Sequence, residues 1–183
     1  MIGQISFINK NEIKIAFGFS ESYAIDLKSG ISKKSLEKKG VSLLLDALSC
    51  SKYILGHHTS GQPYFVNNPN LFVSISHSDG WFAVAIAPHE VGIDIQTKRN
   101  RMKEGADYFI NENEQPFIEN EEYLHIIWCV KEALYKKNGG NYPELKNQVT
   151  VRSIHEHTVC AMSESIPLEI DFLVFKDVYL AFS

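Results

Sequence analysis

The dipeptide Asp79-Gly80 is the feature that most constrains how this chain folds. It lies between two β-rich runs, 71–77 and 81–87. A short Asp-Gly turn between two such runs is typical of a β-hairpin, whose strands are antiparallel. The chain is therefore expected to contain at least one antiparallel sheet.

Other segments show the periodicity of strands or helices. Further strands are predicted over 4–8, 13–19, 91–96, 149–153, 158–162, 168–174 and 178–182. Apolar residues at helical spacing predict helices from about 35 to 48 and over 121–137, and a helical stretch broken at Pro116 is expected over 103–118. The turn-forming residues over 57–63 and 67–70 predict loop. Because helix and antiparallel strands occur in each part, we predict an α+β fold of two pseudo-symmetric halves, 1–88 and 89–183.

The composition excludes several classes of protein. A chain of 183 residues with 44% hydrophobic content can bury a core, and its net charge of −4 gives no general attraction to nucleic acid. No apolar run is long enough to cross a membrane, and the first residues do not resemble a signal peptide. Three widely spaced cysteines indicate reduced thiols rather than a disulfide framework. We expect a cytoplasmic protein with no nucleic-acid or membrane partner.

Asp94 and Glu132 are the candidate metal ligands. Asp94 interrupts an apolar strand, where a carboxylate is costly unless it is paired or bound to a metal. Mg²⁺ commonly takes one or two protein carboxylates and completes its shell with water and phosphate oxygens. The alternative is that Asp94 caps a loop or pairs with Lys131. In the predicted helix over 121–137, Glu132 and Lys136 share a face away from the apolar stripe, and they could equally form an ordinary solvated pair.

His77 is a candidate anion contact. It ends a β-rich run in the sequence Ser76-His77-Ser78, where hydroxyls and backbone amides offer several donors to a phosphate. A single histidine is more often structural than functional. The alternative is therefore that His77 belongs to the packing of the strand.

Three blocks of the sequence resemble the 4′-phosphopantetheinyl transferase superfamily. They are Gly61-Gln62-Pro63 with 73–78, the block Val91-Gly92-Ile93-Asp94-Ile95, and residues 128–136, which are similar to the pattern W-S-x-K-E-[SA]-x-x-K. About ninety residues precede the Asp94 block. In this respect the chain resembles the larger, surfactin-synthetase-activating branch of the superfamily. That resemblance implies a monomer with its active site between two halves of one chain.

The resemblance also implies roles for individual residues. It puts Mg²⁺ on Asp94, Glu132 and the Gln96 position. It makes Glu114 the candidate base, with Glu112 or a water held by the metal ligands as the alternatives. It assigns Glu114, Glu132, Lys136 and His77 to catalysis, and contacts with coenzyme A to Gln62, Ser76, His77, Lys131 and Lys136. The implied reaction moves 4′-phosphopantetheine from coenzyme A to a serine of an apo acyl- or peptidyl-carrier protein and releases 3′,5′-adenosine diphosphate.

Two positions depart from the family pattern. Gln96 stands where relatives often carry a carboxylate, and Gln62 stands where they often carry lysine. Both departures remove charge, so a non-catalytic coenzyme A-binding relative is one alternative. A metal-dependent phosphodiesterase that uses Asp94, Glu132 and His77 is another, since the same residue types suit hydrolysis.

Overall fold

The structure is a computed structural model that describes residues 2–141 and 144–183. The first half of the chain contains β1 (Ile2–Lys10), β2 (Ile13–Ser20), α1 (Tyr23–Lys28), α2 (Lys33–Ala47), β3 (Leu55–His57), β4 (Pro63–Phe65), β5 (Phe72–Ser78) and β6 (Trp81–Ala87). The second half contains β7 (Ile93–Thr97), the 3₁₀ helices η1 (Met102–Tyr108) and η2 (Glu112–Phe117), α3 (Glu121–Lys137), α4 (Leu145–Gln148), β8 (Val149–His155), β9 (Thr158–Ser163), β10 (Ile166–Phe175) and β11 (Val178–Phe182). The predicted α+β fold with antiparallel sheets is confirmed.

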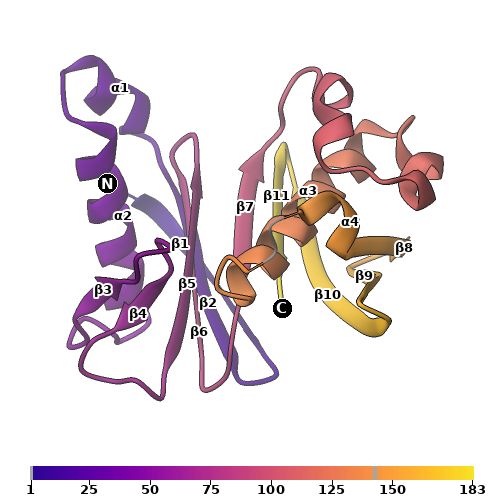
Figure 1. Ribbon diagram of the computed structural model, residues 1–183. Coiled ribbons are helices and arrows are strands. Elements are labelled where there is room, and N and C mark those ends of the chain that lie inside the picture. The colour runs from indigo at the N-terminus through magenta and orange to yellow at the C-terminus, as the bar shows by residue number, and fades with distance from the viewer. Residues whose placement is uncertain (1, 142–143) are drawn as a thin grey trace.

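The two main sheets are stacked, and each carries a helix on its outer side (Figure 1). One sheet has the strand order β1-β2-β6-β5, and the other has the order β7-β11-β10-β9-β8. Between them, alternate residues of β2 and β6 pack against alternate residues of β7 and β11. Helix α2 covers the outer face of the first sheet and α3 covers the outer face of the second. Because this core is shared, the division into separate units at residue 88 stays a prediction.

The edge strands β5 and β7 are joined by a ladder of serine hydroxyls. Ser74, Ser76 and Ser78 alternate along β5, and their Oγ atoms accept hydrogen bonds from the backbone N–H groups of Ile93, Ile95 and Thr97, at 3.1, 3.1 and 3.2 Å. An unpaired buried N–H group is costly, so these three hydroxyls replace the backbone partner that an edge strand lacks. The ladder fixes the position of β7 against β5.

The hairpin turns follow the local sequence. Asp79 and Gly80 both have positive φ, 45° and 89°, as a tight hairpin turn of the mirror-image type requires. Asn11 and Glu12, between β1 and β2, also have positive φ, 49° and 65°. The hairpin predicted at Asp79-Gly80 is therefore confirmed, and the strands predicted over 4–8 and 13–19 pair as a second hairpin. The helix predicted over 121–137 is confirmed as well.

The local structure differs from the sequence-based expectation in three places. Within the segments 57–63 and 67–70, which were expected to be loop, His57 ends β3 and Pro63 begins β4, and these two strands form a small two-stranded sheet. The six-residue helix α1 was not predicted at all. The stretch 103–118 is two 3₁₀ helices, because the Asn111 side chain caps η2 by accepting from Asn113 N, and the Glu114 carboxylate accepts from Asn111 N.

None of the helices in the described residues is both long and apolar enough to cross a bilayer.

Candidate active site

Asp94 is the second residue of β7 and lies on the side of the strand that faces α3. Its neighbours Ile93 and Ile95 point the other way, into the core between the sheets, as strand alternation requires. Asp94 is only 6% exposed. A carboxylate at this depth needs strong partners, because removing an unpaired ion from water costs on the order of several kcal/mol.

Gly92 brings α3 close to β7. A Cβ at this position would lie 1.9 Å from the carbonyl oxygen of Ala133, so only glycine allows the helix and the strand to approach so closely. Gly92 and Ser183 also exchange two backbone hydrogen bonds, of 3.0 and 3.1 Å, which hold this end of the strand. The close approach places the Glu132 side of α3 beside Asp94.

Asp94 Oδ1 has two donors, which come from different parts of the chain. Lys136 Nζ on α3 donates to it at 2.6 Å. Ser76 Oγ on β5 donates to the same oxygen at 2.8 Å, while also accepting from Ile95 N. The candidate site therefore lies where the first sheet meets the second. Sequence reasoning left open whether Asp94 pairs with Lys131, and the structure gives Lys136 as its partner.

Glu132 and Cys129 complete the cluster around Asp94. Burial, and then the charge of Asp94, raise the pKa of the Glu132 carboxyl, while Lys136 opposes the rise. Burial raises the pKa of the Cys129 thiol well above its usual range, and the adjoining Asp94 carboxylate adds to this effect. Cys129 is thus a neutral thiol that packs against the site. Glu132, in contrast, is a carboxylate that would gain from a nearby cation.

The donor set around Asp94 suits Mg²⁺. Among the residues described, no group of three or more His, Cys, Asp or Glu side chains is arranged to hold a metal ion by itself. The site does offer two carboxylates, Asp94 and Glu132, which lie near enough for the charge of Asp94 to raise the pKa of Glu132. That number is normal for a Mg²⁺ ion whose other ligands are water and phosphate oxygens. Gln96 lies two residues along the same face of β7, and its buried Nε2 atom has no hydrogen-bond partner in the described structure. A buried amide without a partner beside Asp94 is consistent with a site in which a bound ligand supplies the missing hydrogen bond.

His77 lies on the other face of β5 from Ser76. Its Nδ1 atom is 3.4 Å from Glu37 Oε1 on α2, and its side chain is 37% exposed. Lys33 also contacts Glu37, at 3.7 Å. The structure therefore does not bring His77 into the Asp94 cluster, but it leaves the ring accessible next to the basic start of α2.

Gln62 approaches the second half of the chain at the end of α3. A Cβ on Gly139 would lie 2.9 Å from Gln62 Oε1, so the two residues are in contact. Gly139 comes three residues after Lys136. Gln62 thus lies beyond the Lys136 end of the cluster.

Glu114 and Lys131 form a sealed ion pair on a different side of α3. Both side chains have no exposed surface, and Lys131 Nζ lies 2.7 Å from Glu114 Oε2. Lys131 Nζ also donates to the carbonyl oxygens of Phe109 and Lys146, and Glu114 Oε1 accepts from Val151 N at 2.7 Å. Burial lowers the pKa of Lys131, and Glu114 opposes that shift. Neither residue reaches the Asp94 cluster, whereas Glu112 is exposed at the start of η2.

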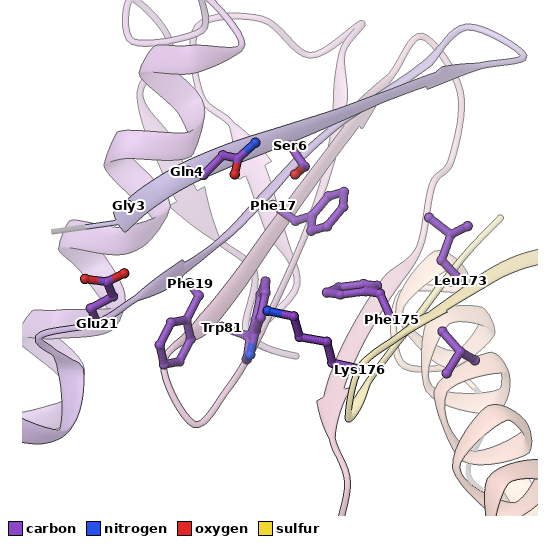
Figure 2. A pocket seen from close by; sticks show the side chains of 11 residues that line it. Gly3, Gln4, Ser6, Phe17, Phe19, Glu21, Trp81, Leu173, Phe175 and Lys176 are labelled. Carbon is purple, nitrogen blue, oxygen red and sulfur yellow. The ribbon is translucent and has the colours of Figure 1, made fainter.

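A cavity of about 560 Å³ lies elsewhere on the molecule, between the open edge of the first sheet and β10 (Figure 2). Phe17, Phe19, Trp81 and Phe175 form its aromatic wall, and Lys176 lies at its rim. None of its lining residues belongs to β5, β7 or α3. The cavity is therefore not part of the Asp94 cluster.

Sequence reasoning missed two features of the site. The first is the positioning role of the serine ladder, although the period-two repeat of serine at 74, 76 and 78 was visible in the sequence. The second is the contact of Gly92 with Ala133 O, for which the only signal was a glycine inside a strand-like run.

Comparisons with known proteins agree with these motifs. The model of the 4′-phosphopantetheinyl transferase superfamily matches residues 90–176. The 4′-phosphopantetheinyl transferase ffp of Bacillus subtilis is 28% identical over 102 residues, which cover 52% of this chain and 45% of the relative. The transferase psf-1 of Bacillus pumilus is 29% identical over 99 residues, covering 51% and 42%. Sfp of Bacillus subtilis strain 168 is 28% identical over 85 residues, covering 43% and 38%. The aligned part of the chain thus spans less than half the length of these curated relatives.

Proposed function

We propose that this chain, whose residues 90–176 match the model of the 4′-phosphopantetheinyl transferase superfamily, transfers 4′-phosphopantetheine from coenzyme A to a serine of an apo acyl- or peptidyl-carrier protein. The observation that carries this proposal is the cluster of Asp94, Glu132 and Lys136 beside Ser76. Two carboxylates and one ammonium at a junction between two sheets suit the alignment of a pyrophosphate. The proposed products are a holo carrier protein and 3′,5′-adenosine diphosphate.

Asp94 and Glu132 are the residues that would hold Mg²⁺, which supplies positive charge to neutralise the pyrophosphate oxygens. Ser76 orients Asp94, because its hydroxyl is itself fixed by Ile95 N. Lys136 provides a mobile ammonium for the same phosphates, one helical turn along α3 from Glu132. The buried amide of Gln96 offers a donor or an acceptor at the neighbouring strand position.

The proton of the attacking serine needs an acceptor at this junction. Glu114 was the candidate base, but its carboxylate is sealed and already accepts from Lys131 and two backbone amides. We therefore assign the proton to Glu132, because Asp94 is already engaged by Lys136 and Ser76 and Glu132 is the other carboxylate of the cluster. The proton passes to a Glu132 oxygen directly or through one water.

The contacts with coenzyme A are proposed to extend along both halves of the chain. Gln62 lies beyond the Lys136 end of α3, and His77 lies next to Lys33 on the α2 side of β5. These groups could reach different parts of one extended nucleotide. Because residues of both halves of a single chain form the cluster, no second copy is needed, which favours a monomer. Action in the cytoplasm remains our expectation.

The experiment is an incubation of the protein with coenzyme A, Mg²⁺ and a panel of apo carrier proteins, followed by the intact mass of each carrier. A transferase adds one phosphopantetheine to at least one carrier. A phosphodiesterase would hydrolyse a phosphodiester substrate without changing any carrier mass. A non-catalytic relative would bind coenzyme A and do neither.

A further inference from the structure

The carboxylate of Asp94 is already neutralised within the protein. Lys136 Nζ lies 2.6 Å from Asp94 Oδ1, and the Asp94 side chain is 9% exposed. At this separation and burial the ammonium compensates much of the cost of placing a carboxylate away from water. Any second cation that binds Asp94, through either carboxylate oxygen, therefore comes close to the Lys136 ammonium and is repelled by it.

The hydrogen bonds at Asp94 Oδ1 indicate which donor can leave. A carboxylate oxygen has room for about two partners, and Lys136 Nζ and Ser76 Oγ fill both positions. Ser76 is fixed from behind, because Ile95 N donates to its hydroxyl. Lys136 has a long flexible side chain, 26% exposed, and Asp94 is its one recorded side-chain partner among the described residues. The ammonium is the donor that can move away.

We propose that Lys136 is a resident counter-cation of Asp94, which a divalent metal ion displaces, so that the released ammonium becomes free to bind phosphate. Two cations at one carboxylate repel each other, so binding of the metal ion favours departure of the Lys136 ammonium. The exchange itself depends only on metal binding at Asp94. The final destination of the ammonium, the pyrophosphate of coenzyme A, rests on the function proposed above.

The exchange couples the metal to the nucleotide. In the free protein the metal must displace Lys136, which weakens its binding. When phosphate oxygens are present, the displaced ammonium gains a new partner, so metal and coenzyme A should each bind more tightly in the presence of the other. Lys136 would thus delay full occupation of the site until both have arrived.

The first test is calorimetric titration of Mg²⁺ into the free protein, comparing wild type with Lys136→Met. Removal of the competitor should tighten Mg²⁺ binding roughly tenfold, which corresponds to about 1.4 kcal/mol. The matched control is Lys137→Met, because Lys137 Nζ donates to Ser183 Oγ at 3.0 Å instead of to Asp94. Lys137→Met should bind Mg²⁺ like wild type, and Lys136→Arg, which keeps the charge, should bind it weakly.

A second test needs no variant. Lysines of the folded wild-type protein are labelled with an amine-reactive acetylating reagent, with and without saturating Mg²⁺, and the labelling rate of each peptide is measured by mass spectrometry. The rate at Lys136 should rise several-fold with Mg²⁺, while the rate at Lys137 should stay constant. This measurement applies even if Lys136→Met fails to fold.

Either of two results overturns the exchange. One is Mg²⁺ binding by folded Lys136→Met that is no tighter than in wild type, including no measurable binding by either protein. The other is a Lys136 labelling rate that does not change with saturating Mg²⁺. Carrier modification is measured in a separate experiment. The proposed exchange of Lys136 can therefore be refuted while transfer is observed, or supported while no transfer is observed.

Discussion

A Cβ on Gly92 would lie 1.9 Å from the carbonyl oxygen of Ala133, so β7 and α3 are in direct backbone contact beside Asp94. This contact sets the distance between the strand that carries Asp94 and the helix that carries Glu132 and Lys136. The geometry of the candidate site thus depends on a residue that has no functional group of its own.

Gly92→Ala should push α3 away from β7. The new Cβ would clash with backbone atoms of Ala133, which cannot move aside as a flexible side chain can. We therefore expect the free energy of unfolding to fall by roughly 1–3 kcal/mol or more. Thermal unfolding followed by circular dichroism measures it. The control is Gly105→Ala, where a Cβ meets no atom within 4 Å. A Gly92→Ala protein as stable as the control would contradict the close contact.

Ser76→Ala should separate positioning of Asp94 from simple stability. It leaves Ile95 N without its partner, which costs about 1–3 kcal/mol, and it also removes the Ser76 bond to Asp94. Ser74→Ala is matched, because Ser74 accepts from Ile93 N at the next ladder position. Mg²⁺ affinity should fall about tenfold in Ser76→Ala only, by analogy with other residues that support metal ligands. Equal metal affinities in the two variants would remove the positioning role.

Lys131→Met should destabilise the protein strongly without touching the Asp94 cluster. It leaves the Glu114 carboxylate buried without a cation, at a cost of about 3–5 kcal/mol. The double variant Glu114→Gln with Lys131→Met should recover part of this loss. Lys103→Met breaks only the exposed pair with Glu119 and should change stability by less than about 1 kcal/mol. If Lys131→Met instead kept full stability and lost coenzyme A binding, the resemblance-based role of Lys131 would be restored.

Gln96→Glu tests the departure from the family pattern at the metal site. Gln96 is 3% exposed, so the new carboxylate would be buried near Asp94 and would need a cation. Mg²⁺ should bind the free protein roughly tenfold more tightly, because a third anionic group attracts it. Calorimetric titration measures this against Gln115→Glu, an exposed position in η2. Equal affinity in wild type and Gln96→Glu would mean that residue 96 does not face the metal.

Much of the fold could be predicted because its signals are local. The turn Asp79-Gly80 predicted a hairpin from backbone conformation alone, and the helix over 121–137 begins and ends at the residues expected. The prediction failed where weak propensities needed tertiary partners. The strands β3 and β4 are three residues each and exist only as a pair, packed through Phe65 and Leu55 onto the core under α2.

The site could be predicted only in part, for a related reason. Asp94, Glu132 and Lys136 were found because a motif and helical spacing placed them together, and the structure brings them together. Lys131 and Glu114 belong to the same motifs, but the direction in which each side chain points depends on how α3 packs against η2 and β8. Helical spacing places Lys131 beside the apolar stripe, four residues after Ile127, but it does not show that Glu114 is the partner of Lys131 in the core.

The most direct test of the account is the intact mass of an apo carrier protein after incubation with coenzyme A, Mg²⁺ and either wild type or Glu132→Gln. Glu122→Gln, an exposed change in the first turn of the same helix, is the control. Wild type and Glu122→Gln should add one phosphopantetheine to the carrier at similar rates. Glu132→Gln should stay folded and should lose more than about 100-fold in rate, since it removes a metal-binding carboxylate and the proposed base. Transfer by Glu132→Gln at the wild-type rate would contradict the assignment of the site.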